Sequence, residues 1–113
     1  MKCRGTQGMS RMLLVIGLMV FFGGVARADD SATLFKGKCA ACHGDDGSGS
    51  STMGKALGAK DLRSAEVQKQ TDAQLADIVT NGTDGGKMPA YKGKLTDDQI
   101  KGLIGYIRSL AAK

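Results

Sequence analysis

The chain is poor in the residues from which small binding sites and cores are usually built. Among its 113 residues it has no tryptophan, one proline, one histidine and three cysteines. A zinc site needs about four ligands, and no cysteine or histidine follows His43. Internal repeats and low-complexity tracts are absent, and a chain of this length forms one small domain at most. The composition therefore disfavours a zinc site and a multidomain protein.

The N-terminal residues have the features of a secretory signal peptide. A basic start with Lys2, Arg4 and Arg11 precedes an apolar stretch over residues 12–25. Glycines interrupt this stretch, and it is shorter than the about 20 apolar residues that a membrane-spanning helix needs. The Ala-Arg-Ala sequence that follows, ending at residue 28, matches the small-x-small pattern of a cleavage site. We predict a signal peptide over residues 1–28, a domain over residues 29–113 and a periplasmic or otherwise exported protein, with an uncleaved membrane tether as the alternative.

Removal of residues 1–28 changes the charge and the composition of the chain. The segment holds four of the 16 basic residues and none of the 11 acidic ones, so the net charge falls from +5 to +1. The basic excess of the full chain is therefore no indication of nucleic-acid binding. The remaining 85 residues keep three aromatic side chains, Phe35, Tyr91 and Tyr106. Domains with so little apolar material usually need a metal or cofactor to complete the core.

One short motif indicates which cofactor this is. Cys39-Ala40-Ala41-Cys42-His43 has the C-x-x-C-H pattern by which a c-type haem is attached. The two thiols add across the two vinyl groups of haem, and the imidazole that follows supplies the proximal iron ligand. A thioredoxin-like redox pair would need a βαβ setting, which no strand-like run provides here. A structural disulfide is a further alternative, although it gives His43 no role. We predict one covalently bound haem c.

The second iron ligand is predicted from the few residues that could supply it. Because the chain has a single histidine, two histidine ligands are excluded within one subunit. After loss of residues 1–28 only Met53 and Met88 offer a thioether. Pro89 biases Met88 toward an extended conformation, and the preceding Gly85-Gly86 pair allows a tight turn. Met53 lies in a glycine- and serine-rich stretch and is interpreted as lining or covering the haem crevice. We predict Met88 as the distal iron ligand, with Met53 or an open site as alternatives.

Sequence patterns predict helices and no strands, so the fold class is all-α. A first helix is expected from about Ala32, with Ser31 or Asp30 as its N-cap, then a loop over residues 44–54 and a short helical turn over residues 63–69. Capping boxes at Thr71 and Thr96 open two later helices. The last helix has an apolar face with helical spacing, which comprises Ile100, Leu103, Ile104, Ile107 and Leu110. Two glycines on it, Gly102 and Gly105, would allow another helix to approach. Four apolar residues are candidates to line the haem pocket, namely Leu57, Leu62, Leu75 and Ile78.

In combination, these motifs resemble a small class I c-type cytochrome of the bacterial monohaem kind. The resemblance rests on residues 39–44, 87–91, 95–100 and 106–107, and it covers essentially all of the chain after residue 28. It implies three to five short helices wrapped around one haem, with the first and last helices crossing where Phe35 meets Leu103 and Tyr106.

The same resemblance implies what the protein does. We expect a monomeric single-electron carrier, not an enzyme, with His/Met ligation by His43 and Met88. Its partners would be redox donor and acceptor proteins, including membrane-associated complexes, with neither nucleic acid nor a small-molecule substrate. An electron-delivering subunit of a larger redox enzyme is the first alternative. A haem sensor or peroxidase with an open sixth iron position is the second.

Overall fold

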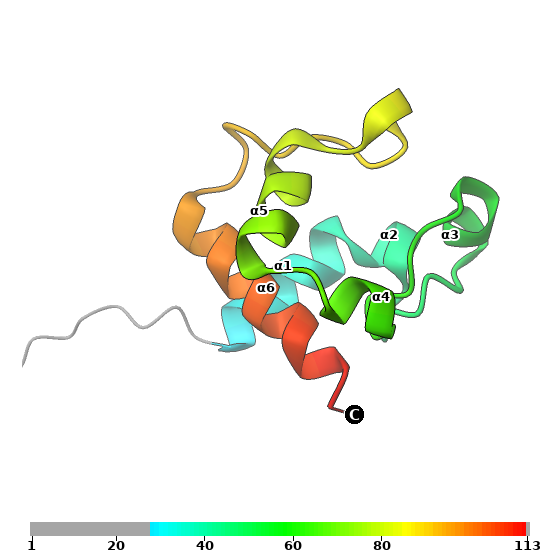
Figure 1. Ribbon diagram of the computed structural model, residues 1–113, viewed down its shortest axis with the longest axis horizontal. Coiled ribbons are helices and arrows are strands. Elements are labelled where there is room, and N and C mark those ends of the chain that lie inside the picture. The colour runs from blue at the N-terminus through cyan, green and yellow to red at the C-terminus, as the bar shows by residue number, and fades with distance from the viewer. Residues whose placement is uncertain (1–27, 113) are drawn as a thin grey trace, which may run out of the picture.

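Helices make up the regular structure of residues 28–112, which are the residues that the computed structural model describes (Figure 1). In chain order the elements are α1 (Ala28–Lys38), α2 (Ala40–His43), α3 (Thr52–Leu57), α4 (Ala65–Gln68), α5 (Asp72–Asn81), the 3-10 turn η1 (Asp84–Gly86) and α6 (Asp97–Leu110). Extended pairing within these residues is limited to an isolated bridge between Lys92 and Leu95. The predicted all-α class is therefore confirmed. The six α-helices exceed the expected three to five because α2 and α4 are single turns of four residues.

Both predicted capping boxes are present. The Thr71 hydroxyl accepts the N–H of Gln74 at 3.1 Å, and the Gln74 side chain accepts the N–H of Thr71 at 2.9 Å. The same reciprocal pair joins Thr96 and Gln99 at the start of α6. Each box satisfies two N–H groups that have no partner within the helix. The two boxes thus fix where α5 and α6 begin.

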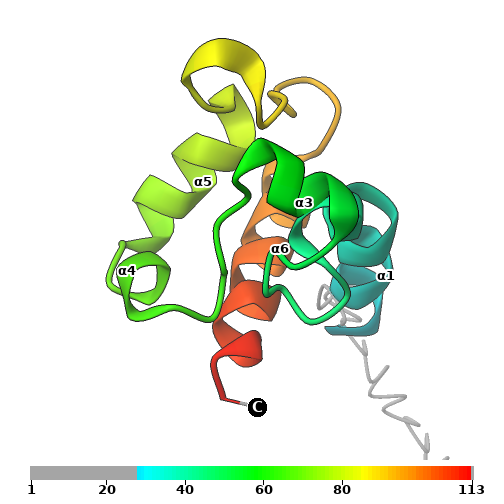
Figure 2. The ribbon, with the colours of Figure 1, turned by 90° about the vertical axis from the view of Figure 1, so that its right-hand side faces the viewer.

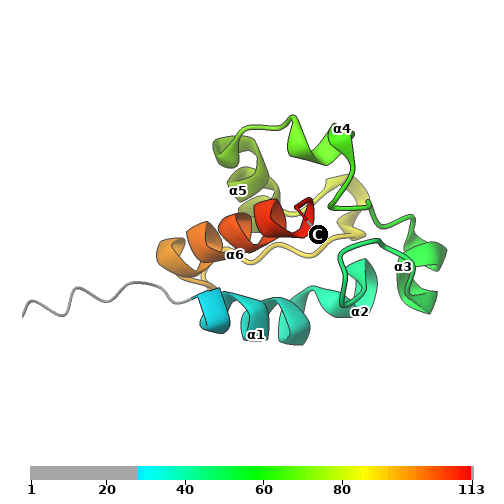
Figure 3. The ribbon, with the colours of Figure 1, turned by 90° about the horizontal axis from the view of Figure 1, so that it is seen from below.

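Helix α6 is central to the packing. Figures 2 and 3 show α4 and α5 on one side of α6, with α1 and α2 on the other. The predicted apolar face of α6 is buried along its whole length. Phe35 of α1 has no exposed surface, and its ring centroid lies 5.0 Å from that of Tyr106 at a tilted angle of 50°. Such a tilted aromatic pair is favourable beyond the area it buries. The predicted crossing of the first and last helices is therefore confirmed.

A glycine allows α1 and α6 to approach each other. Helix α1 begins at Ala28 rather than near Ala32, so Asp30 and Ser31 both lie within the helix and the prediction that one of them caps it is wrong. Ser31 is buried. A Cβ added to Gly102 would lie only 2.5 Å from the Ser31 hydroxyl oxygen. The same role predicted for Gly105 is wrong, because no atom of another helix lies within 4 Å of the position of its Cβ.

Arg108 of α6 fixes the connection between α4 and α5. Its guanidinium donates to the carbonyl oxygens of Gln68 at 2.9 Å and Gln70 at 2.5 Å. It also pairs with the Asp72 carboxylate at 2.9 Å. The Gln68 amide in turn donates to the Ile107 carbonyl at 3.1 Å. Bonds from a charged guanidinium are stronger than neutral ones, so α5 is attached to α6 by polar as well as apolar contacts.

The predicted signal peptide over residues 1–28 lies outside the described residues, except for Ala28 at the start of α1. Its cleavage therefore stays a prediction. Within residues 28–112, none of the helices has both the length and the apolar character needed to cross a membrane. The longest, α6, has 14 residues, whereas a membrane-spanning helix needs about 20.

The contact between α1 and α6 leads to a first prediction. We expect Gly102→Leu to lower the free energy of unfolding by about 1–3 kcal/mol, because the added side chain has to displace Ser31. Gly105→Leu is the matched control, since it places the same side chain on the same helix in open space. Helix propensity should raise its free energy of unfolding by up to about 1 kcal/mol. Chemical denaturation of the purified variants measures both values, and equal effects would contradict the predicted close approach.

Candidate haem site

Helix α1 leads directly into the C-x-x-C-H motif. The N–H of Cys39 donates to the Phe35 carbonyl at 2.8 Å, so the chain stays helical as it leaves α1. Cys39 then precedes α2, where the N–H groups of Cys42 and His43 donate to the Cys39 carbonyl at 3.2 and 2.9 Å. Both cysteines are free, half-buried thiols. A single turn of backbone thus holds the two predicted haem-attaching thiols and the predicted proximal ligand.

The Cys39 thiol is held in its protonated form. Burial, and secondarily the neighbouring Cys42, raises the pKa of the Cys39 thiol to about 11. The reactive cysteine of a disulfide-exchange pair has the opposite property, a lowered pKa. Within residues 28–112, no three His, Cys, Asp or Glu side chains are grouped in a way that could hold a metal ion. A thioredoxin-like pair and a zinc site therefore gain no support from the structure.

A backbone carbonyl orients the ring of His43. The Nδ1 atom lies 3.0 Å from the carbonyl oxygen of Lys60. Because a carbonyl oxygen can only accept, Nδ1 carries a proton, and in the neutral imidazole Nε2 then has the lone pair that can bind a metal. Lys60 was not predicted as this partner. No signal in the sequence could have revealed it, since every residue has a carbonyl group.

Ser51 and Gly54 dock α3 onto the motif. The Ser51 hydroxyl accepts the Gly54 N–H at 2.9 Å and lies 2.8 and 3.0 Å from the carbonyl oxygens of Ala41 and Cys42. Gly54 is buried against the Cys42 carbonyl, where any Cβ would overlap the oxygen. The loop predicted over residues 44–54 is therefore wrong in its last part, which belongs to α3. Ser51 was not predicted as the N-cap of a helix, although serine is one of the residue types preferred at that position.

Two large apolar side chains on α3 are uncovered. Met53 exposes 55% of its surface and Leu57 exposes 36%. They lie on the helix that packs against α2, which contains Cys42 and His43. Exposed apolar surface on a helix next to the motif fits a site where a flat apolar cofactor is bound. The interpretation of Met53 as a residue that lines or covers the haem crevice stays a prediction.

Met88 is held against the core by the end of α5. It is half-buried and packs against the hydrophobic core. The Thr83 N–H donates to the Met88 carbonyl at 3.2 Å, and the Tyr91 N–H donates to the Val79 carbonyl at 3.1 Å. Gly82 ends α5 with a φ of 73°, and a Cβ there would lie 2.6 Å from the Met88 carbonyl oxygen. The Met-Pro segment therefore depends on glycine at this position.

Tyr91 links the Met88 segment to the C-x-x-C-H motif. Its hydroxyl donates to the Lys38 carbonyl at 2.9 Å, at the end of α1. Partial burial raises the pKa of the Tyr91 phenol, and the nearby Cys39 and Cys42 thiols raise it further. The phenol therefore stays protonated and able to donate at neutral pH. The structure thus brings the segment that follows Met88 close to both cysteines, a link that sequence analysis missed.

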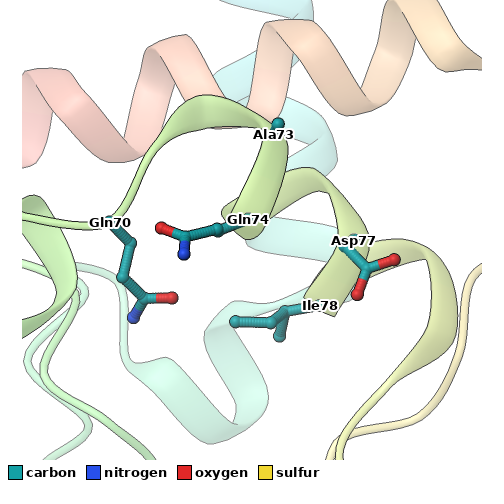
Figure 4. Close-up of a pocket in the computed structure, with 5 residues that line it drawn as sticks. All are labelled: Gln70, Ala73, Gln74, Asp77 and Ile78. Carbon is teal, nitrogen blue, oxygen red and sulfur yellow. The ribbon is translucent and has the colours of Figure 1, made fainter.

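A cavity of about 460 Å³ opens along α5. The residues that line it are Gln70, Ala73, Gln74, Asp77 and Ile78. Figure 4 shows the side chains of Gln70, Gln74 and Ile78 directed into a common space. Ile78, one of the residues predicted to line the haem pocket, thus faces a cavity. Leu62 and Leu75, predicted to do the same, are buried in the core.

The side chains of this region fit haem c. Two free thiols have the spacing that haem attachment requires, and the imidazole next to them keeps one nitrogen for iron. A half-buried thioether lies on a segment that bonds back to the end of α1. These are the donor atoms of a covalently attached haem with His/Met ligation. The individual roles of Cys39, Cys42, His43 and Met88 stay predictions.

Comparison with known proteins gives a family and relatives of two kinds. The family model for "Cytochrome C oxidase, cbb3-type, subunit III" matches residues 26–107. A cytochrome c6 from Leptolyngbya boryana is 37% identical over 91 residues, which cover 78% of this chain and 98% of that protein. The cbb3-type cytochrome c oxidase subunit CcoP of Azospirillum brasilense is 37% identical over 86 residues, or 75% of this chain. The chain spans only 29% of the length of that subunit.

A solved structure agrees with these relatives. The KustC0563 c-type cytochrome matches with a TM-score of 0.65 and 32% sequence identity. The match covers 71% of this chain and 95% of that structure. Sequence and fold thus point the same way over most of the described residues. The chain belongs to the c-type cytochrome family that the cbb3-type subunit III model describes, and it is a small class I c-type cytochrome.

Proposed function

We propose that the chain is a single-electron carrier with one haem c, held through Cys39 and Cys42 and ligated by His43 and Met88. Haem c follows from membership of the family, whereas these residue roles are our proposal. The observation that supports them best is the turn over residues 39–43, where two free thiols precede an imidazole whose Nδ1 is already bonded. Bound haem supplies an iron couple that exchanges one electron at a time.

The residues of this chain would shape that couple in three ways. The Lys60 carbonyl fixes the orientation of the His43 ring and raises the basicity of its free nitrogen. The Met88 thioether favours ferrous iron and hence a relatively high reduction potential. With both residues on the iron, no position is left for oxygen or a substrate. This arrangement favours electron transfer over catalysis at the iron.

We propose larger redox proteins as the partners of the chain. Lysines are frequent around the proposed site, and Lys38, Lys87 and Lys92 are exposed. Acidic residues such as Asp84 lie among them, and the chain without residues 1–28 has a net charge of only +1. We therefore expect weak electrostatic steering of partners. Export to the periplasm and a monomeric state belong to the same proposal.

A second candidate function is an electron-delivering component of a larger redox complex. It is favoured by the match to the cbb3-type subunit III model and by the relative named CcoP. A fixed component should remain bound to its complex at high salt, where a diffusing carrier dissociates. A haem sensor or peroxidase instead needs an open iron position, which carbon monoxide binding to the ferrous protein at neutral pH would reveal.

The prediction on export concerns residues 1–28. We expect the secreted protein to begin at Asp29 and to contain covalent haem, because the preceding segment has the features of a cleavable signal. Intact mass of the protein recovered after export measures both properties. A membrane-bound product that retains residues 12–25 would refute cleavage and would make the chain a tethered carrier.

The prediction on haem attachment concerns the two cysteines of the motif. We expect Cys39→Ala combined with Cys42→Ala to abolish covalent haem and cooperative unfolding, because three aromatic side chains give a thin core. Mass and thermal melting followed by circular dichroism measure the two effects. A haem-free double variant that melts sharply with full helix content would refute the dependence of the core on haem.

The prediction on the distal ligand compares the two methionines that follow residue 28. We expect Met88→Ala to remove the weak charge-transfer absorption of the ferric iron–thioether bond and to lower the reduction potential. It should also open the iron to carbon monoxide. Met53→Ala is the matched control and should change none of these properties much, because Met53 is exposed on α3. The reverse result would make Met53 the ligand, and no effect of either change would indicate an open site.

A further inference from the structure

Thr83 makes two hydrogen bonds to the residue proposed as the distal ligand. The Thr83 N–H donates to the Met88 carbonyl at 3.2 Å. The Met88 N–H donates to the Thr83 hydroxyl at 3.2 Å. Both polar groups of the Met88 backbone are thus bonded to one residue, which lies directly after the end of α5 and its Gly82 C-cap.

The loop between these two residues gives Met88 little other support. The residues over 83–87 are all exposed. Gly85 and Gly86 have φ values of 81° and 69°, and nothing lies within 4 Å of where their Cβ atoms would be. Side-chain packing therefore does not hold this loop in place. Its conformation depends on the hydrogen bonds between its two ends. The two hydrogen bonds between Thr83 and Met88 join the first residue of the loop to the residue that follows it.

The chain after Met88 is attached at a different place. Pro89 has no N–H to donate, and the next attachments are the bonds from Tyr91 to the Val79 carbonyl and from Lys92 to the Thr80 carbonyl. These bonds hold the C-terminal side of the Met-Pro segment. Thr83 holds the N-terminal side, so Met88 lies between two points of attachment to the end of α5.

We propose that Thr83 is a positioning residue for Met88, acting through its hydroxyl on the Met88 N–H. The inference rests on the proposed role of Met88 as iron ligand and adds a residue to it. The hydroxyl fixes the Met88 backbone, so less of the protein populates conformations in which the thioether is away from the iron. Thr83 touches neither iron nor haem in this role.

Competition by external imidazole for the ferric iron tests the proposal. Imidazole binds only when the thioether is displaced, so its apparent affinity reports the fraction of protein without that bond. We expect Thr83→Val in the haem-loaded protein to raise the imidazole affinity about threefold. This is near the low end of the effect of losing one net hydrogen bond, because Thr83 is exposed. Valine keeps the branched shape at Cβ but cannot accept the Met88 N–H. Thr83→Ser keeps a hydroxyl and should retain the affinity of the parent protein.

Thr80→Val is the matched control for a general effect on stability. The Thr80 hydroxyl donates to the Ala76 carbonyl at 2.7 Å within α5, so the same substitution removes a different bond from the same helix end. We expect Thr80→Val to leave the imidazole affinity unchanged, even if it lowers the free energy of unfolding. An unchanged affinity in Thr83→Val, or an equal rise in Thr80→Val, would overturn the positioning role.

Met88→Ala separates the failure of this inference from the failure of the proposed ligand. If Met88→Ala leaves the charge-transfer absorption and the imidazole affinity unchanged, Met88 is not the ligand and both proposals fall. If Met88→Ala removes the absorption while Thr83→Val has no effect, the ligand stands and only the role of Thr83 fails. With both correct, adding Thr83→Val to Met88→Ala should cause no further change in imidazole affinity.

Discussion

The crossing of α1 and α6 around Phe35 is the packing contact on which the proposed haem site depends. It buries Phe35 completely beside Tyr106, and it fixes the direction in which α1 ends. The carbonyl of Phe35 accepts the N–H of Cys39, so the thiol turn continues a helix that the core already holds. The position of the two thiols and of His43 thus follows from a contact that buries Phe35 completely.

The position of Met88, the proposed distal ligand, depends on the C-terminal end of α5. Arg108 joins the start of α5 to α6, whereas Met88 is attached to the other end through Gly82 and backbone hydrogen bonds. The segment after Met88 is joined to the end of α1 where the Tyr91 hydroxyl donates to the Lys38 carbonyl. Packing against α6 and the hydrogen bond of the Tyr91 hydroxyl therefore both help to set the separation between the two proposed ligands, His43 and Met88.

Much of this structure could be predicted because it depends on residues close together in sequence. The capping box at Thr71, the apolar face of α6 and the thiol turn each involve contacts within a few residues. The start of α1 could not be predicted, because Ser31 is a good N-cap by type but is buried against Gly102 of a distant helix. The supports of the site, the Lys60 carbonyl and the Tyr91 hydroxyl, were missed for the same reason.

The two halves of the site differ in how firmly the fold holds them. The motif turn continues α1, which is anchored in the core by Phe35, and Cys39 and Ala40 pack against the same core. Met88 follows an exposed, glycine-containing loop whose conformation depends on a few hydrogen bonds, so substitutions there have little effect on core packing. With Met88 as the proposed distal ligand, we expect substitutions in the loop over residues 83–87 to change the strength of its bond to iron.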